Sequence, residues 1–78
     1  VVELNRAIAR RYRDGADVAL DDVERLAEAL DTYYLFHATR AELLRDLGRE
    51  HEARAALRRA LELTANPAER ALLQQRLS

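Results

Sequence analysis

Apolar side chains recur at helical spacing from the start of the chain. Between Val1 and Arg13 they stand three, four and eight positions apart, which places them on one face of a helix. This first stripe consists of Leu4, Ala7, Ile8 and Tyr12. A turn is expected at Asp14-Gly15, and either Asp14 or Asp17 could cap a second helix after it. The stripe of that second helix consists of Leu20, Val23, Leu26, Ala27 and Leu30.

A third helix is predicted from about Tyr33 to Leu47. Either Asp31 or Thr32 could serve as its N-cap. Gly48 is expected to end it, because glycine adopts the left-handed backbone conformation there without a Cβ clash.

Two more helices complete the pattern. The fourth has acidic residues in its first turn, and its apolar stripe consists of Ala53, Leu57, Ala60 and Leu61. The fifth runs to about Leu77 and has the clearest start signal in the chain. Asn66 is its expected N-cap, Pro67 its first residue and Glu69 the acidic member of a capping box.

The chain repeats itself at about 34 residues. Gly15 and Gly48 lie 33 positions apart, and so do Ala27 and Ala60. Helical hairpins at this spacing are typical of tetratricopeptide (TPR) repeats. The expected fold is therefore all-α, with two antiparallel TPR-like hairpins and a C-terminal capping helix, five helices in a single domain over residues 1–78.

The second hairpin carries the more specific repeat pattern. Ala53 and Ala60 would let two helix axes approach closely, and Leu57 would fill the space between them. Two positions depart from the repeat, since His37 stands where it usually has Trp and Arg40 where it has Leu.

Composition narrows the possible functions. The 78 residues carry 13 basic residues, all Arg, against 14 acidic ones, a net charge of −1 that does not suit an electrostatic binder of nucleic acid or membranes. There is no cysteine for a disulfide or thiolate metal site, and no apolar run approaches the ~20 residues of a membrane helix. We expect a cytoplasmic domain, and a first residue of Val instead of Met favours a piece of a longer chain.

Three stretches of the chain resemble a narrower family. They are VVELNRAIA, YYLFHATRAELLRDLGR and LELTANPAERALLQQRL, with the runs Asn5-Arg6-Ala7 and Thr64 to Arg70 as the most specific parts. Together they resemble the C-terminal TPR-like extension of one subgroup of bacterial extracytoplasmic-function (ECF) sigma factors. The resemblance implies that two DNA- and polymerase-binding domains precede the extension in a parent protein that initiates transcription. It also implies that the extension is a regulatory module whose partners are the parent's own sigma domains or RNA polymerase.

No catalytic, cofactor or metal site is predicted. His37 and His51 are the only histidines and fall on different helices, with no cysteine to complete a ligand set. We expect His37 to pack between the hairpins and His51 to lie at a helix start. No hydroxyl residue has a base beside it, and the pair Asp21-Asp22 lies on an acidic, solvated face, so we do not expect an enzyme.

Two features allow both a structural and a functional interpretation. The run from Tyr33 to Phe36 covers all sides of a helix start, so its rings either fill the space between neighbouring helices or include a partner contact. Residues 1–15 carry a charge of +2 and residues 16–31 a charge of −5. These segments either attract each other modestly, or the acidic one forms a docking face for a basic partner.

A groove is the candidate binding site. In TPR pairs the first helix of each hairpin lines a concave groove, which would place the stripe Val2, Asn5, Ala9 and Tyr12 beside Leu35, Ala38, Glu42 and Arg45. We expect Asn5, Tyr12, Glu42 and Arg45 to contact an extended peptide or a helix there. Asn5 could instead be buried and satisfied by backbone. Because the chain has no Lys, we do not expect the TPR subclass that clamps a C-terminal carboxylate.

Two functional hypotheses follow. The first is the regulatory domain of an ECF sigma factor, and the second is a TPR-like adaptor domain of an unrelated protein that binds a peptide or helix in its groove. The sigma hypothesis requires a helix-turn-helix region encoded upstream of Val1.

Overall fold

The computed structural model describes residues 2–78, with side chains from Leu4 onward. Over these residues the fold is all-α, as predicted, with six helices and no strand. The helices are α1 (Val2–Asp14), α2 (Ala16–Glu24), α3 (Ala27–Leu30), α4 (Tyr34–Asp46), α5 (Glu50–Leu63) and α6 (Pro67–Leu77). The expected count of five helices is therefore wrong.

The difference arises in the second predicted helix, which is divided into α2 and α3. The backbone N–H of Leu26 bonds to the carbonyl of Val23, three residues earlier, at 2.9 Å. This tighter turn ends the α-helical register, and α3 adds one further turn before the chain reaches α4. As a result Leu26, Ala27 and Leu30 are only half-buried. No Gly or Pro marks the break, so the apolar spacing alone predicts a continuous helix.

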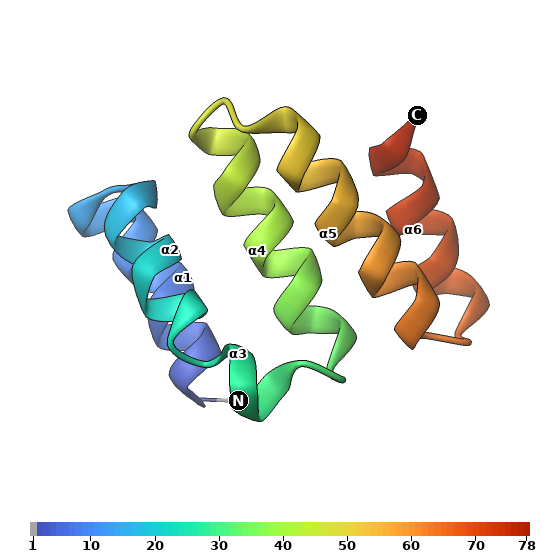
Figure 1. The fold of residues 1–78 in the computed structure, drawn as a ribbon, viewed down its shortest axis with the longest axis horizontal. Helices are drawn as coiled ribbons and strands as arrows, with labels where there is room; N and C mark the ends of the chain where they lie inside the picture. The colour runs from blue at the N-terminus through green and yellow to red at the C-terminus, as the bar shows by residue number, and fades with distance from the viewer. Residues whose placement is uncertain (1) are drawn as a thin grey trace.

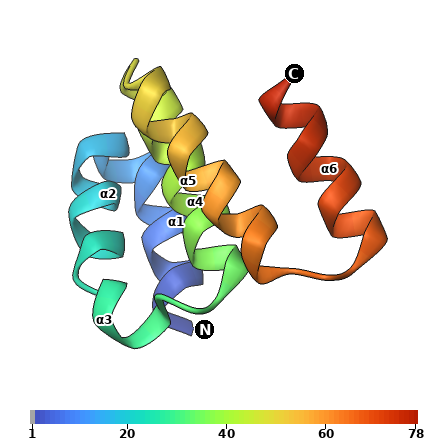
Figure 2. The ribbon, with the colours of Figure 1, turned by 45° about the vertical axis from the view of Figure 1, so that its right-hand side comes forward.

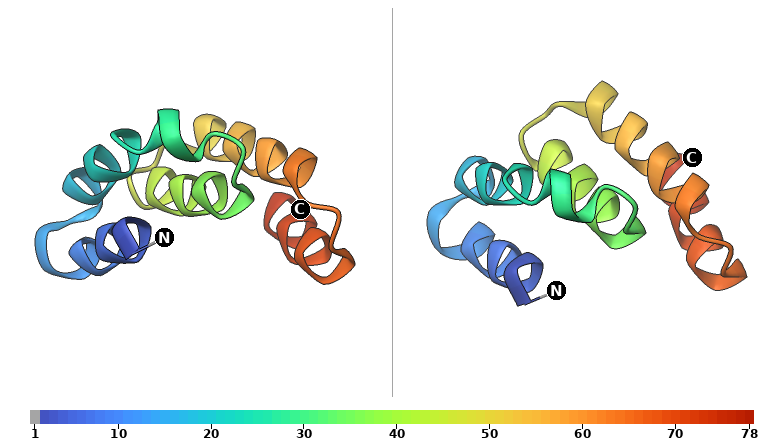
Figure 3. Two further views of the ribbon diagram at one scale, coloured as in Figure 1. Left: turned by 90° about the horizontal axis from the view of Figure 1, so that it is seen from below. Right: turned by 60° about the horizontal axis from the view of Figure 1, so that its bottom comes forward.

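The helices form two layers that arch around α4. α4 has its most extensive contact with α5 and also packs against α2, while α1 packs chiefly against α2 and α6 against α5. Seen from below, α1, α4 and α6 lie along the inner side of the arch, and α2, α3 and α5 along the outer side (Figures 1 and 3). In the turned view α6 stands on the far side of α5 from the first two helices (Figure 2).

The core is built mainly from small and medium aliphatic residues. Ala53 and Ala60 are completely buried and Leu57 is 2% exposed, which confirms the predicted packing face of α5. Burying a leucine side chain contributes about 1.5 to 3 kcal/mol. The buried apolar residues are Leu4, Ala7, Ala19, Leu20, Val23, Phe36, Ala38, Ala41, Leu43, Leu44, Ala53, Ala56, Leu57, Ala60 and Leu73.

One predicted core position is wrong. Tyr12 is 81% exposed, although it follows Leu4 at helical spacing. Eight residues at about 100° each rotate Tyr12 by roughly 80° from Leu4, in the direction opposite to Ala7. The buried face of α1 lies between Leu4 and Ala7, so Tyr12 falls outside it. Its ring lies instead against the Arg11 guanidinium, 5.5 Å from the ring centroid.

The C-terminal end of α4 is determined by Gly48. Its φ of 76° allows its N–H to bond to the Arg45 carbonyl at 3.0 Å and the Arg49 N–H to bond to the Leu44 carbonyl at 2.9 Å. This pair of bonds is a Schellman motif. The predicted helix end at Gly48 is confirmed.

The predicted cap of α6 is also confirmed, with one addition. The Asn66 side-chain oxygen accepts from the N–H groups of Ala68 at 2.9 Å and Glu69 at 3.1 Å. Glu69 does not bond directly to the Asn66 N–H, as it would in a simple capping box, but is linked to it by the Thr64 hydroxyl. The Thr64 hydroxyl donates to the Glu69 carboxylate at 2.5 Å and accepts from the Asn66 N–H at 3.3 Å.

The predicted caps of the second and third helices are wrong. Gly15 is the N-cap of α2 and Tyr33 that of α4, and neither position has a side-chain cap bond. Asp14 instead accepts from Arg10 and Arg13, both at 3.2 Å, and the Arg10 hydrogen bond lowers the pKa of its carboxyl group. A guanidinium is a stronger partner for a carboxylate than a backbone amide.

Candidate interaction site

A pocket of about 120 Å³ lies on the inner layer between α4 and α6. Its apolar surface comes from Ala38 and Ala41 of α4 and Leu57 of α5, all three of them buried. Its remaining lining residues are Glu42, Arg45 and Arg76. A small apolar surface is thus bordered by one acidic and two basic residues.

The structure brings two of the four predicted groove residues together. Glu42 and Arg45 line the pocket, whereas Asn5 and Tyr12 lie on α1 and do not line it. Asn5 is exposed, so the alternative of a buried, backbone-satisfied Asn is wrong. The predicted groove lies between α1 and α4, but this pocket lies on the α6 side of α4.

Arg76 is the lining residue that the sequence analysis missed. It stands 34 residues after Glu42, so it would be found by extending the repeat period into the last helix. The Asn66-Pro67 signal predicts that helix only as a cap.

Arg45 connects three helices at one end of the pocket. Its guanidinium donates to both Glu50 oxygens, at 3.1 and 3.0 Å, and to the backbone carbonyl of Arg76 at 3.2 Å. Arg54 of α5 donates to the Leu77 carbonyl at 2.6 Å. Two arginines therefore satisfy carbonyl groups at the C-terminal end of α6, where positive charge also complements the helix dipole.

Glu42 is held by an arginine from α1. Arg11 donates to Glu42 at 3.1 Å and, through two nitrogens, to the Asp46 carboxylate at 2.6 and 3.0 Å. The hydrogen bond with Asp46 is the main reason that the pKa of Arg11 is raised, and that with Glu42 adds to it. Since the contact between α1 and α4 is otherwise limited, this cluster is the principal polar link between them.

The opposite charges of the first two segments do meet. Arg10 of α1 donates to Asp22 of α2 at 2.5 Å, as the attraction hypothesis predicts. Glu24 of α2 accepts from Arg40 of α4. Asp17 and Asp21 are exposed, and an acidic docking face that includes them stays a prediction.

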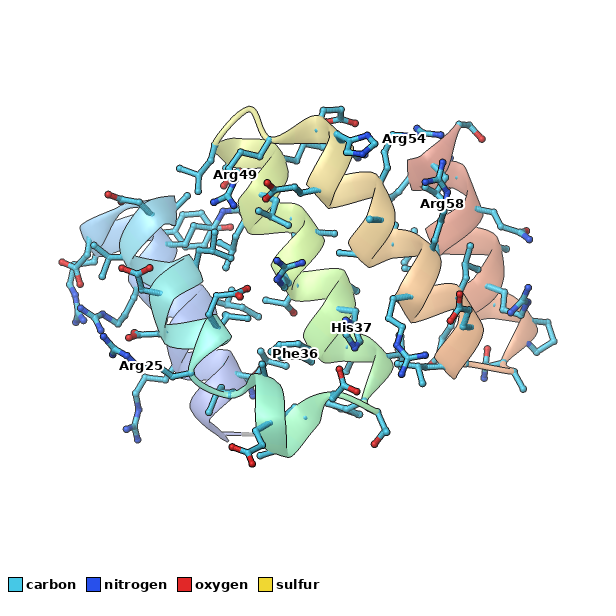
Figure 4. All side chains as sticks on the ribbon, in the orientation of Figure 1. Arg25, Phe36, His37, Arg49, Arg54 and Arg58 are labelled. Atoms are coloured by element: carbon cyan, nitrogen blue, oxygen red, sulfur yellow. The ribbon has the colours of Figure 1, made fainter. Side chains whose placement is uncertain are left out.

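One of the two histidines is buried and the other is exposed. His37 is 8% exposed, its ring meets Phe36 edge-on at 4.9 Å, and its Nε2 donates to the Asp31 carbonyl at 2.7 Å (Figure 4). His51 lies exposed in the first turn of α5.

The aromatic run at the start of α4 is mostly packed. Phe36 is in the core, and Tyr33 and Tyr34 are half-buried against it. Hydrogen bonding to Glu69 is the main reason that the pKa of the Tyr34 phenol is raised. The exposed member of the run is Leu35, so the core interpretation fits the three rings better than a partner contact does.

A second hollow, of about 240 Å³, lies between α1 and the turn that separates α2 from α3. It is lined by Arg6, Ala7, Asp22, Arg25 and Leu26. Asp22 is already bonded to Arg10 and Arg25.

Within residues 2–78, none of the helices is both long and apolar enough to cross a membrane.

Comparison with curated proteins shows a similar chain in a bacterium. The chain is 46% identical over 77 residues to an uncharacterized protein of Rhizobium meliloti (strain 1021). The alignment covers 99% of this chain and 18% of the relative, so the chain spans less than a fifth of that protein's length. No family model matches the chain. No solved structure matches it either.

Proposed function

We propose that this chain is a TPR-like protein-interaction domain that regulates transcription initiation as part of an ECF sigma factor in the bacterial cytoplasm. The observation that carries this proposal is the position of α4, which packs against α2 on one side and α5 on the other while α1 lies parallel in the same layer. Two stacked helical hairpins would produce this arrangement, and the offset of 33 residues between Gly15 and Gly48 fits it.

The relative's length also supports a place in a longer protein. A protein more than five times the length of the aligned segment has room for the two domains that the resemblance implies. A binding role, and not a catalytic one, suits a domain whose described polar clusters consist of arginine–carboxylate pairs and helix caps.

Charge argues for protein partners. The chain has a net charge of −1, and eight of its 13 arginines contact described carboxylates of the chain itself. These are Arg10, Arg11, Arg13, Arg25, Arg40, Arg45, Arg49 and Arg59. Few arginines are left to neutralise DNA phosphates. The domain would therefore act on the parent's DNA-binding domains or on RNA polymerase.

The test is transcription in vitro with the full-length parent and a version that lacks this segment. We expect the deletion to reduce transcript yield while the remaining domains still bind promoter DNA. Unchanged transcript yield after deletion would overturn the regulatory proposal. Absence of a helix-turn-helix region upstream of Val1 would instead favour the TPR-like adaptor of an unrelated protein.

A further inference from the structure

We propose that the pocket between α4 and α6 receives an Asp or Glu side chain of a partner protein, and that Arg76 binds its carboxylate. This inference rests on the proposed function, because it names the partner chemistry of a protein-interaction domain. The expected occupant is a single Asp or Glu side chain of the partner protein, bound without a cofactor.

The size of the pocket limits its occupant. Sites for drug-sized ligands and cofactors measure about 300 to 1,000 Å³. This pocket measures about 120 Å³, which suits a single side chain. Its alanine and leucine surface can contact the methylene groups of Asp or Glu, while the charged border meets the carboxylate.

The Arg76 guanidinium favours an acidic occupant of the pocket. Glu42 shares Arg11 with Asp46, and Arg45 is paired with Glu50. Among the side chains that the structure describes, no carboxylate lies within ion-pair distance of Arg76, although Arg76 is half-buried. Arg76 is therefore the guanidinium at the pocket that has no carboxylate partner among the described side chains, and a guanidinium forms its strongest hydrogen bonds with carboxylates.

Arg76 is also the lining residue best suited to substitution. Reversing the charge of Glu42 or Arg45 would break ion pairs that join helices, so loss of binding could reflect a disturbed fold. The contact that Arg76 makes with Arg45 uses its backbone carbonyl, which survives substitution of its side chain. Arg58 is a matched control, because it is an exposed arginine on the outer-layer helix α5 and does not line the pocket (Figure 4).

The experiment is an NMR titration of the chain with a blocked helical peptide of alanine, leucine and glutamate. A second peptide has glutamine in place of every glutamate. We expect the glutamate peptide to shift the signals of Ala38, Ala41 and Leu57 and to bind about tenfold more tightly than the glutamine peptide, as one charge-assisted hydrogen bond allows. The variant Arg76→Gln should lose this preference, and Arg58→Gln should keep it.

Three results would overturn the inference. These are equal binding of both peptides, an unchanged preference in Arg76→Gln, and the same pattern of shifts on adding duplex DNA in place of the peptide. None of these binding results changes what is expected of the transcription assay with the deletion. A reduced transcript yield on deletion together with any of these results would leave the regulatory function standing and remove only this pocket.

Discussion

The two halves of the molecule are held together by different means. In the half formed by α4, α5 and α6, α4 contributes seven buried residues and packs against both α2 and α5, and α5 contributes four. In the half formed by α1, α2 and α3, α1 contributes Leu4 and Ala7, α2 contributes three buried residues and α3 none. The C-terminal half therefore relies mainly on apolar packing, and the N-terminal half depends more on polar links.

The ends of the helices differ in the same way. α4 ends in a Schellman motif at Gly48, and Asn66 caps α6. In the N-terminal half neither α2 nor α3 has a side-chain cap, as is also true of α4 and α5, and α1 is tied to its neighbours by Arg10 and Arg11. Since exposed ion pairs contribute only about 0 to 1 kcal/mol each, we expect the N-terminal half to open more readily than the C-terminal half.

The largest effect is expected from a charge between α4 and α5. Ala53→Arg or Leu57→Asp should lower the free energy of unfolding by several kcal/mol, because each places an unpaired charge in a completely packed site. Ala55→Arg is the control, since Ala55 is exposed on the same helix. Urea midpoints measure the effect, and equal midpoints for Ala53→Arg and Ala55→Arg would contradict the packing described for α5.

A smaller loss is expected at the two glycine turns, and the N-terminal turn should suffer more. Gly48→Ala meets nothing within 4 Å, so its cost is the left-handed backbone alone, about 1 to 2 kcal/mol. Gly15 has φ 100° and ψ 160°, a region almost restricted to glycine, and an added Cβ would lie 3.0 Å from the Asp17 carboxylate. Thermal melting of both variants should give the lower midpoint for Gly15→Ala. The reverse order would show that the backbone at Gly15 relaxes.

Loss of the α6 cap should cost about 1 to 2 kcal/mol. Asn66→Ala with Pro67→Gly removes the acceptor of two N–H bonds and the preset first turn. Hydrogen exchange should accelerate over residues 68–77 and stay unchanged in α2. Asn66→Asp keeps the acceptor and serves as the control. Unaltered exchange in α6 of the double variant would refute the capping role.

The smallest effect is expected at the link between α1 and α4. Arg11→Gln should destabilise by about 1 kcal/mol or less, and 1 M salt should reduce the difference from wild type. A double-mutant cycle with Asp46→Asn isolates the pair energy. A salt-independent loss would mean that Arg11 acts through the packing of its aliphatic stem instead of its charge.

The difference between the two halves also explains which helix boundaries could be predicted from the sequence. Boundaries were predicted well where a local backbone requirement fixes them, as Gly48 does for α4 and Asn66-Pro67 for α6. The break between α2 and α3 has no such residue and depends on how the chain must turn to reach α4. Leu26, Ala27 and Leu30 still lie against the core after the break, so the spacing of apolar residues looks the same as in a continuous helix.

The placement of the candidate site residues has a similar limit. Glu42 and Arg45 are placed by the repeat pattern and do lie together. Asn5 and Tyr12 were expected beside them because the first helices of adjacent TPR hairpins line one groove. In the structure the pocket is instead completed by Arg76 of α6. Arg11 and Asp46 form an ion pair between α1 and α4 although they stand 35 residues apart in the chain. Nothing in the local sequence indicates which of the 13 arginines pairs with Asp46.

The central claim is that this domain acts through protein contacts and not through DNA. The most direct measurement is fluorescence anisotropy of the labelled chain, titrated separately with the rest of the parent protein, with RNA polymerase and with duplex promoter DNA at physiological salt. We predict saturable binding to the parent remainder or to polymerase, and no change with DNA. Saturable binding to DNA that weakens steeply with salt, without binding to either protein, would contradict the claim.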